Sequence, residues 1–332
     1  MDKKSLISDV AGLSKPLTKL VETLANGAGI LYGPIHKKRM AKATAEEIQI
    51  IADVCQKNLQ IPIDYEKDGV VISTNQQIAD LAKRAMLCNL AQEMNKQQNI
   101  EEILRVTKDV LEHETAVSNE PVSQTWLSNF LEAAGHVEEE DLQKIWGKLL
   151  AGEIKQPNSY SLRTLNTLKN MTTNEAKIFQ FLSPYVMRIG NDFILPNDRK
   201  LHEKYSIGYG NILLLDECGL INAQNTLNIT FSSGPGGLMS ILACNLLAEL
   251  HENAGINMHL QMSMYPLTAA GRELFQIVKE ESNQDFFKDT IKMIEQNNKN
   301  ISARIYKKEL IHGKDGKMIE YFDIHHPIYP EK

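Results

Sequence analysis

The sequence has few cysteines, and none is placed to form a cysteine-based site. Its 332 residues include four, Cys55, Cys88, Cys218 and Cys244, which stand far apart without a CxxC pair or a histidine at metal-ligand spacing. Zinc sites and disulfide frameworks use cysteines at characteristic short spacings. We therefore expect reduced thiols in a cytoplasmic protein, with no metal and no other cofactor.

Long apolar runs and a surplus of positive charge are also missing. No run of about 18 apolar residues occurs, which argues against a simple membrane-spanning helix. The first ten residues lack the apolar segment of a signal peptide. Acidic residues outnumber lysine and arginine by 42 to 36, for a formal charge of -6. Binding along nucleic acid requires a basic surface, so specific DNA binding is not expected.

Catalytic signatures are scarce as well. His251-Glu252 lacks the HExxH spacing of a zinc protease, and no GxSxG elbow occurs. His325 and His326 are adjacent, so a strand would point them to opposite faces. The sequence assigns no catalytic residue and favours a protein that is not an enzyme. A site assembled from distant residues stays open.

Helical periodicity dominates the first half of the chain. Residues 75–114 carry little glycine or proline and predict one long helix. Apolar stripes predict further helices within residues 118–137 and 138–154. A polar-faced helix is expected over residues 41–58, and a hairpin or a loop around residues 61–74.

The most distinctive stretch is a packing signature, "LQKIWGKLLAGEIKQPNSYSLRTLNTLKNM", residues 142–171. It reads as two helices separated at Pro157. Ser159 or Ser161 can cap the second helix, and Thr172 with Glu175 predicts a capping box for the next one. The side chains expected to face inward are Trp146, Leu149, Leu150, Leu162, Leu165 and Leu168.

The pattern changes to mixed helix and strand after Pro184. The expected elements are a strand (193–196), two short helices (198–224), a strand (226–233), a helix (236–253), a strand pair or a strand and a helix (256–278), a helix (285–296) and a hairpin (301–326). The fold class is therefore α+β, with a mainly helical N-terminal half and a mixed, winged-helix-like C-terminal half.

Three parts are expected: a basic amphipathic N-terminal arm (1–45), a helical domain (46–172) and an α+β winged-helix-like domain (173–332). The winged-helix interpretation rests on two helices followed by strands. The second of these helices carries Asp216 and Glu217 where a DNA reader would carry basic residues. This favours a packing module over DNA recognition.

The N-terminal arm combines an apolar stripe with basic residues. Leu17, Leu20, Val21 and Leu24 recur at helical spacing behind a helix start at Ser14 and Pro16. Such a segment suits a membrane surface, packing between subunits, or packing on its own domain. The expected membrane or partner surface consists of Lys15, Lys19, Lys37, Lys38, Arg39 and Lys42.

A glycine-rich loop follows the strand expected at residues 226–233. Its backbone amides would hold an anion if the loop opened a helix, and a tight connection is the alternative. No GKS/T arrangement follows, which excludes a nucleotide-hydrolysing P-loop. The candidate anion loop consists of Ser232, Ser233, Gly234, Gly236 and Gly237.

The chain resembles an uncharacterised bacterial family, a domain of unknown function with members near phage-defence genes. Three stretches carry the resemblance: "NKQQNIEEIL", "VSQTWLSNFLEAAGHVEEEDLQKIWGKLLAGEIKQPNSYSLRTLNTLKNMTTNEAKIF" and "YPLTAAGRELF". The opening "GLSKPLTKLVETLANGAGILYGPIHKKRMAKA" is similar to abortive-infection alpha-type proteins. The resemblance implies a biological setting and supplies no catalytic residues. Where Asn158 stands, the family commonly has glycine.

We therefore expect a non-enzymatic bacterial anti-phage protein, similar to those of abortive infection, that acts through oligomerisation and protein or membrane-surface contacts. Its expected partners are further copies of itself, a phage protein as trigger and the inner-membrane surface. It would be cytoplasmic or peripheral on the inner membrane. Two alternatives stay open: a nucleic-acid-processing or nucleotide-binding defence enzyme, and a winged-helix DNA-binding regulator.

Overall fold

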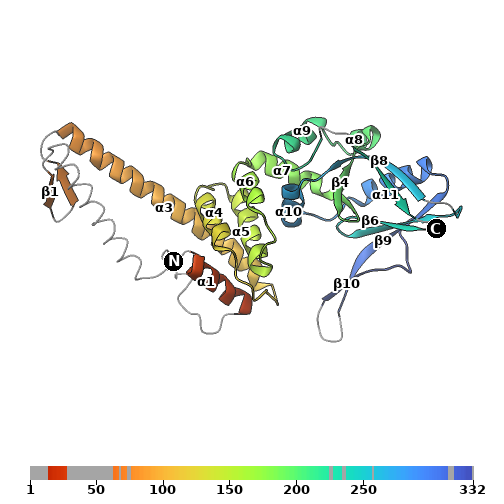
Figure 1. The fold of residues 1–332 in the computed structure, drawn as a ribbon, viewed down its shortest axis with the longest axis horizontal. Helices are drawn as coiled ribbons and strands as arrows, with labels where there is room; N and C mark the ends of the chain where they lie inside the picture. The colour runs from red at the N-terminus through yellow and green to blue at the C-terminus, as the bar shows by residue number, and fades with distance from the viewer. Residues whose placement is uncertain are drawn as a thin grey trace. The chain divides into compact units, whose positions relative to one another are not determined.

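The structure is a computed structural model and describes residues 14–27, 63–66, 69–72, 76–223, 227–233, 237–255, 258–312 and 318–330. The chain divides into two compact units, Met1–Ser159 and Tyr160–Lys332. Helices dominate the first unit, and an antiparallel sheet organises the second (Figure 1). The expected α+β class is thus confirmed. The boundary expected between residues 172 and 173 falls inside unit 2, and the three-part division stays a prediction.

Unit 1 contains a hairpin and a set of packed helices. Its described elements are α1 (Lys15–Gly27), β1 (Ile63–Glu66), β2 (Gly69–Ile72), α3 (Gln76–Glu112), α4 (Gln124–Ala134) and α5 (Glu140–Lys155). β1 and β2 pair antiparallel, which decides for the hairpin over the loop. α3 confirms the long helix. The helix expected over residues 41–58 lies outside the described residues.

Three aromatic rings form the centre of the unit 1 core. Phe130 stacks on Trp126 at a centroid distance of 5.3 Å and meets Trp146 at 5.2 Å. Trp146 and Phe130 have no exposed surface. A buried large side chain contributes roughly 1.5–3 kcal/mol, so these rings are a main source of the unit's stability.

Gly147 lets α5 approach α3 closely. A Cβ added there would lie 2.6 Å from Cβ of Val106, which is closer than atoms can pack. At the same point the buried hydroxyl of Thr107 donates to the Gly147 carbonyl over 3.1 Å. The residue after the signature tryptophan is therefore small because two helix backbones meet there.

Asn158 occupies a backbone conformation that favours glycine. Its φ is 67°, in the left-handed region, which asparagine tolerates better than most residues. Its N–H donates to Oε1 of the buried Glu153 over 2.7 Å. This geometry explains why glycine and asparagine both suit the position.

Unit 2 is built on an eight-stranded antiparallel sheet in the described part of the chain. The strand order is β10-β9-β7-β6-β3-β4-β8-β5. The elements are α6 (Leu162–Lys169), α7 (Thr173–Leu182), the 3-10 helix η1 (Ser183–Tyr185), β3 (Met187–Ile189), β4 (Asp192–Pro196), α8 (Arg199–Lys204), α9 (Tyr209–Glu217), β5 (Leu227–Ser233), β6 (Leu238–Leu242), β7 (Leu246–Glu252), β8 (Met258–Pro266), α10 (Ala269–Val278), α11 (Gln284–Asn297), β9 (Ile301–His312) and β10 (Met318–Phe322).

The local capping signals are confirmed. Ser161 is the N-cap of α6, and Thr172 with Glu175 forms the complete capping box of α7. The expectation that Leu162 faces inward is wrong, because its side chain is 42% exposed. α6 turns Thr164, Leu165 and Leu168 inward, and Leu162 lies about a third of a turn away from the centre of that face.

The helix expected over residues 236–253 is wrong, because this segment forms the antiparallel pair β6 and β7. Burial alternates along β7: Leu246, Ala248 and Leu250 are buried, and the residues between them are half-buried. Leucine and alanine favour helices intrinsically. Pairing on both sides, with β6 and β9, makes the segment a strand instead.

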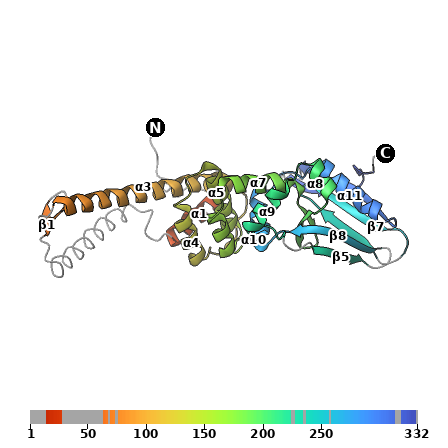
Figure 2. The same ribbon diagram turned by 90° about the horizontal axis from the view of Figure 1, so that it is seen from above.

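One face of the sheet is covered by α8 and α11, which lie together along it (Figure 2). α11 buries Phe286, Phe287, Ile291 and Ile294. The helix pair α8 and α9 and the antiparallel pair β5 and β8 match the elements of the winged-helix interpretation. Here β8 also pairs with β4, so these strands continue into the large sheet.

α10 approaches the turn after α9 at Gly271. A Cβ there would lie 1.9 Å from the Leu220 carbonyl oxygen. Thr268, the N-cap of α10, donates from its backbone N–H to the same oxygen over 3.0 Å, and from its hydroxyl to the Gly219 carbonyl over 2.6 Å. The position of α10 therefore depends on a glycine in its first turn.

We expect Trp146→Ala to lower the free energy of unfolding by roughly 3–5 kcal/mol, the usual cost of truncating a large buried aromatic. Denaturant unfolding followed by circular dichroism measures it. Lys148→Ala, on the exposed face of the same helix, is the control and should change stability by no more than about 0.5 kcal/mol. Equal effects of the two substitutions would show that the ring is not a core element.

We expect Gly271→Ala to destabilise the protein by at least about 1–3 kcal/mol, because the added methyl group overlaps a backbone carbonyl. Gly210→Ala is the matched control. Gly210 lies in α9 with nothing within 4 Å of its Cβ position, so alanine there should be neutral or stabilising by at most about 1 kcal/mol. Thermal melts of both variants compare them, and a Gly271→Ala protein as stable as wild type contradicts the close approach.

Candidate functional site

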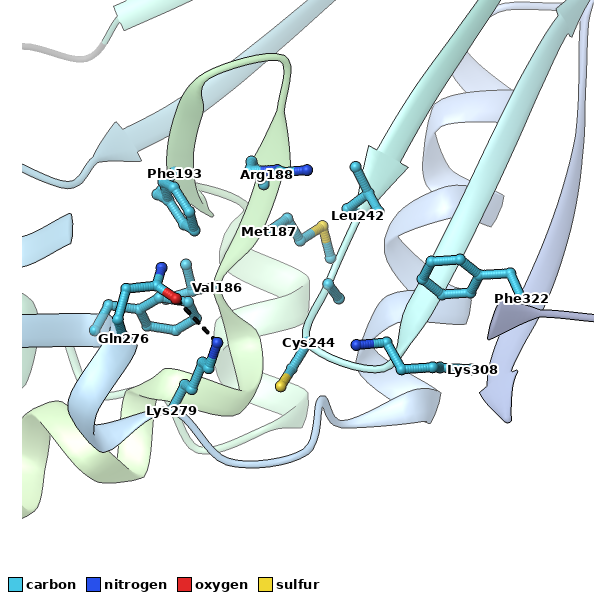
Figure 3. A pocket seen from close by; sticks show the side chains of 12 residues that line it. Val186, Met187, Arg188, Phe193, Leu242, Cys244, Gln276, Lys279, Lys308 and Phe322 are labelled. Carbon is cyan, nitrogen blue, oxygen red and sulfur yellow. Dashed lines mark hydrogen bonds between the residues drawn. The ribbon is translucent and has the colours of Figure 1, made fainter. Parts of the chain in front are cut away.

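A pocket of about 210 Å³ opens in unit 2 where the sheet meets the end of α10 (Figure 3). Four segments that are distant in sequence form it: β3 with β4, the β6–β7 connection, the C-terminal turn of α10, and β9 with β10. Its lining residues are Val186, Met187, Arg188, Phe193, Leu242, Ala243, Cys244, Phe275, Gln276, Lys279, Lys308 and Phe322.

Strand register brings Arg188, Phe193 and Leu242 of the pocket to one face of the sheet. Arg188 of β3 lies opposite Leu242 of β6 on one side and opposite Phe193 of β4 on the other. Residues that face each other across antiparallel strands point to the same side of the sheet. Lys308 and Phe322 are opposite each other in the β9–β10 pair by the same rule.

The floor of the pocket is apolar. Val186, Met187 and Phe275 are buried, and Phe193 meets Phe275 at a ring-centroid distance of 5.4 Å. Apolar surface of this kind binds the carbon skeleton of a ligand by excluding water. At the side of the pocket, the ring centroid of Phe322 lies 6.0 Å from Nζ of Lys308.

Cationic groups surround this apolar floor. Lys279 donates from Nζ to Oε1 of Gln276 over 2.9 Å, a neutral partner that leaves its charge uncompensated. Lys308 donates to Oε2 of Glu320 over 2.9 Å, and both side chains are partly exposed. In Figure 3 the two ammonium groups reach in from opposite sides, with Cys244 drawn between them.

The lowered pKa of Glu320 reflects the positive charge around the pocket. Its hydrogen bond with Lys308, the charge of Lys308 and, more weakly, the charge of Lys279 hold the pKa of this exposed carboxyl below its ordinary value. Three cations, Arg188, Lys279 and Lys308, line the pocket, and the carboxylate that pairs with one of them, Glu320, is exposed. The arrangement suits the binding of an anion with an apolar part. None of the twelve lining residues is a carboxylate or a histidine.

A second hollow lies beside α6, α7 and α9 and has a volume of about 390 Å³. Glu175 at its edge already serves the α7 capping box, where the Thr172 N–H lowers the pKa of the carboxyl. Burial, together with the charges of Glu175 and Glu217, raises the pKa of the neighbouring Cys218 to about 12. A thiol with this pKa is protonated at neutral pH and is therefore a poor nucleophile.

The structure places two of the six predicted surface residues of the N-terminal arm. Lys15 is exposed, and Lys19 donates from Nζ to the Asn119 carbonyl over 3.1 Å. Lys37, Lys38, Arg39 and Lys42 lie outside the described residues.

The apolar stripe of the arm is largely covered within unit 1. Leu17, Leu20 and Leu24 are buried where α1 packs against α3, α4 and α5. Of the three roles expected for the stripe, these three side chains therefore show the last, packing within the protein's own unit. None of the helices in the described ranges combines the length and the apolar character that crossing a bilayer requires.

The candidate anion loop lies between two strands. Ser232 and Ser233 end β5, Gly237 precedes β6, and Gly234 and Gly236 lie outside the described residues. The helix whose N-terminus would have favoured an anion is β6 instead. Anion binding by this loop stays a prediction without that support.

Two further expectations concern metals and DNA. In the part of the chain that the structure describes, no three His, Cys, Asp or Glu side chains gather as metal ligands would. α9, the helix in the recognition position, has the sequence YGNILLLDE without a basic residue. The structure therefore adds no support to the alternative of a winged-helix DNA-binding regulator.

A protein family described as "Protein of unknown function (DUF2806)" matches residues 83–291. The chain belongs to this family. The matched range contains most of the pocket lining, including Arg188 and Lys279, whereas β9 and β10 with Lys308 and Phe322 lie beyond it. Among curated proteins and among solved structures, none matches the chain.

Sequence reasoning missed the pocket because no local motif marks it. Its cations come from a strand near residue 188, a helix end near residue 279 and a strand near residue 308. Each is an ordinary surface lysine or arginine in its own segment. Only the register of β3, β6 and β9 in the sheet brings them to one place.

We expect Cys218 to resist alkylation at pH 8 in the folded protein, because a pKa of about 12 leaves almost no thiolate there. The exposed Cys88 is the internal control and should react faster. Timed alkylation with iodoacetamide, read out by peptide mass spectrometry, compares the two sites. Equal rates in the folded protein would contradict the buried environment of Cys218.

Proposed function

We propose that the protein is a non-enzymatic bacterial anti-phage protein of the abortive-infection kind, which acts by assembling with itself and by contacting other molecules. The single observation that supports assembly is the exposure of the described side chains between residues 85 and 95 of α3. The setting in phage defence is supported by the resemblance of residues 12–43 to abortive-infection alpha-type proteins.

α3 is a long helix with both buried and exposed side chains among those that the structure describes. Its 37 residues span about 56 Å at 1.5 Å per residue. Among its described side chains, the buried apolar ones are Ile100, Ile103, Leu104 and Leu111. In the first half, the described side chains of Ala85, Cys88, Asn89 and residues 91–95 are exposed.

Met94 gives this exposed surface an apolar contact point. It is 56% exposed, and methionine adapts to irregular packing partners. An exposed helix carrying such a side chain suits packing against the same helix of a second copy, as in symmetric dimers. Assembly would also present several copies of any partner surface at once, which strengthens weak contacts by avidity.

The contacts with a membrane or a phage protein are assigned to the basic residues of the arm. Because Leu17, Leu20 and Leu24 are buried in unit 1, we assign the contact to charge and not to insertion of the α1 stripe. Each basic residue close to an anionic lipid surface contributes about 1 kcal/mol, so a single copy would bind weakly and an oligomer firmly.

We expect Met94→Glu to shift the protein from an oligomer to a monomer, because a charge at the helix contact repels its symmetric copy. Mass photometry over a range of concentrations measures the shift. Cells that express this variant should lose the protection against phage that wild-type expression provides, measured as efficiency of plating.

Two controls separate assembly from folding. Asn95→Glu places the same charge on the neighbouring exposed position, which faces another side of α3, and should leave assembly and protection intact. The melting temperature of Met94→Glu should stay close to that of wild type at low concentration. A wild-type protein that is monomeric at all concentrations, or that never lowers plating, contradicts the proposal.

A further inference from the structure

The pocket beside α10 has the composition of a binding site for a small anion on a ring. Its volume of about 210 Å³ lies below the roughly 300–1,000 Å³ of sites for drug-sized ligands. It therefore fits a ligand the size of a single ring with one charged group. The apolar floor and the cationic rim occupy different sides of the same space, so such a ligand can satisfy both at once.

The cationic rim selects the charge of the ligand. Arg188 is exposed and makes no hydrogen bond or ion pair with a described residue, so its guanidinium is available for bidentate contact with an oxyanion. Lys279 has two further N–H donors beyond its bond to Gln276. An anion with several oxygens uses such donors better than a carboxylate does, which favours phosphate.

The aromatic residues select the body of the ligand. Phe193 is half-buried, and its ring forms one wall together with the buried Phe275. Phe322 is half-buried at the side where Lys308 approaches. Aromatic rings prefer offset-stacked or edge-to-face contacts with other rings, and a planar ring in this space would meet Phe193 or Phe322 in one of these ways.

Glu320 acts as a competitor for the anion. Its carboxylate lies 2.9 Å from Nζ of Lys308, and the pair is exposed, which makes it weak and easily exchanged. A ligand oxyanion that reaches Lys308 would replace this carboxylate. Removal of the Glu320 charge should therefore strengthen binding, an effect opposite to that of removing a cation.

We propose that the pocket formed by Arg188, Phe193, Phe275, Lys279, Lys308 and Phe322 binds a phosphate monoester carried on an aromatic ring. The phosphate contacts these cations, and the ring lies against Phe193 or Phe322. Phosphotyrosine has this chemistry, whereas a nucleoside monophosphate carries its phosphate on a ribose and is larger. The site lies in unit 2 and does not depend on defence activity or on assembly.

Protection of Cys244 tests the proposal with the full-length protein. This thiol lines the pocket between the two lysines, so a bound ligand should slow its alkylation by N-ethylmaleimide, while the exposed Cys88 of unit 1 reacts at an unchanged rate. The probe with a phosphate on an aromatic ring is phenyl phosphate. Inorganic phosphate and phenol, its two halves, should each protect Cys244 more weakly than phenyl phosphate does.

Variants then test the residues. Lys279→Gln combined with Lys308→Gln should weaken phenyl phosphate binding, measured by titration calorimetry, by about tenfold or more, which corresponds to about 1.4 kcal/mol. Lys307→Gln is the matched control, because it removes the same charge from the adjacent residue of β9, which points to the other face of the sheet. Glu320→Gln should bind the probe more tightly than wild type.

The outcomes separate cleanly. Stronger protection by O-phosphotyrosine than by AMP supports a phosphate carried on an aromatic ring, and the reverse overturns this assignment. Equal protection by phenol and phenyl phosphate overturns the anion assignment. A double variant that binds like wild type, an unchanged Glu320→Gln, or the absence of any protection of Cys244 by phenyl phosphate overturns the proposal.

Discussion

The close approach of α10 to the Leu220 carbonyl at Gly271 is the constraint on which the arrangement of unit 2 depends. Any side chain there would overlap the oxygen at 1.9 Å. A second contact joins α10 to α6. Glu273 of α10 accepts hydrogen bonds from the Ser161 N–H over 2.7 Å and from the Thr164 hydroxyl over 2.5 Å. Held in this way, α10 delivers its last turn to the pocket.

The pocket is formed where the antiparallel sheet meets the C-terminal end of α10. The register of the sheet places Arg188, Phe193 and Leu242 on one face, and the end of α10 adds Lys279 beside them. Its charges are held by exposed, exchangeable partners, Gln276 and Glu320. Rigid walls with loosely satisfied cations are suited to reversible binding, since little has to be broken when an anion enters.

Unit 1 shows why the most distinctive sequence segment of this chain consists of residues that pack in a core. Trp146 fills the centre of the core, and Gly147 beside it lets two helix backbones touch. The large ring and the missing side chain are both required by the same helix contact. Elsewhere in the unit, the described side chains of α3 between residues 85 and 95 are exposed.

The sequence by itself determined the elements whose physics is local. The caps at Ser161 and Thr172, the long helix α3 and the buried stripe around Trp146 follow from neighbours within a few residues. Only the tertiary structure decided that residues 238–252 form two strands, because leucine and alanine suit either state until β9 supplies a partner. The pocket was decided in the same way: its cations are surface residues in their own segments, and they become a site only because strands and a helix end from distant parts of the chain are brought together by sheet register.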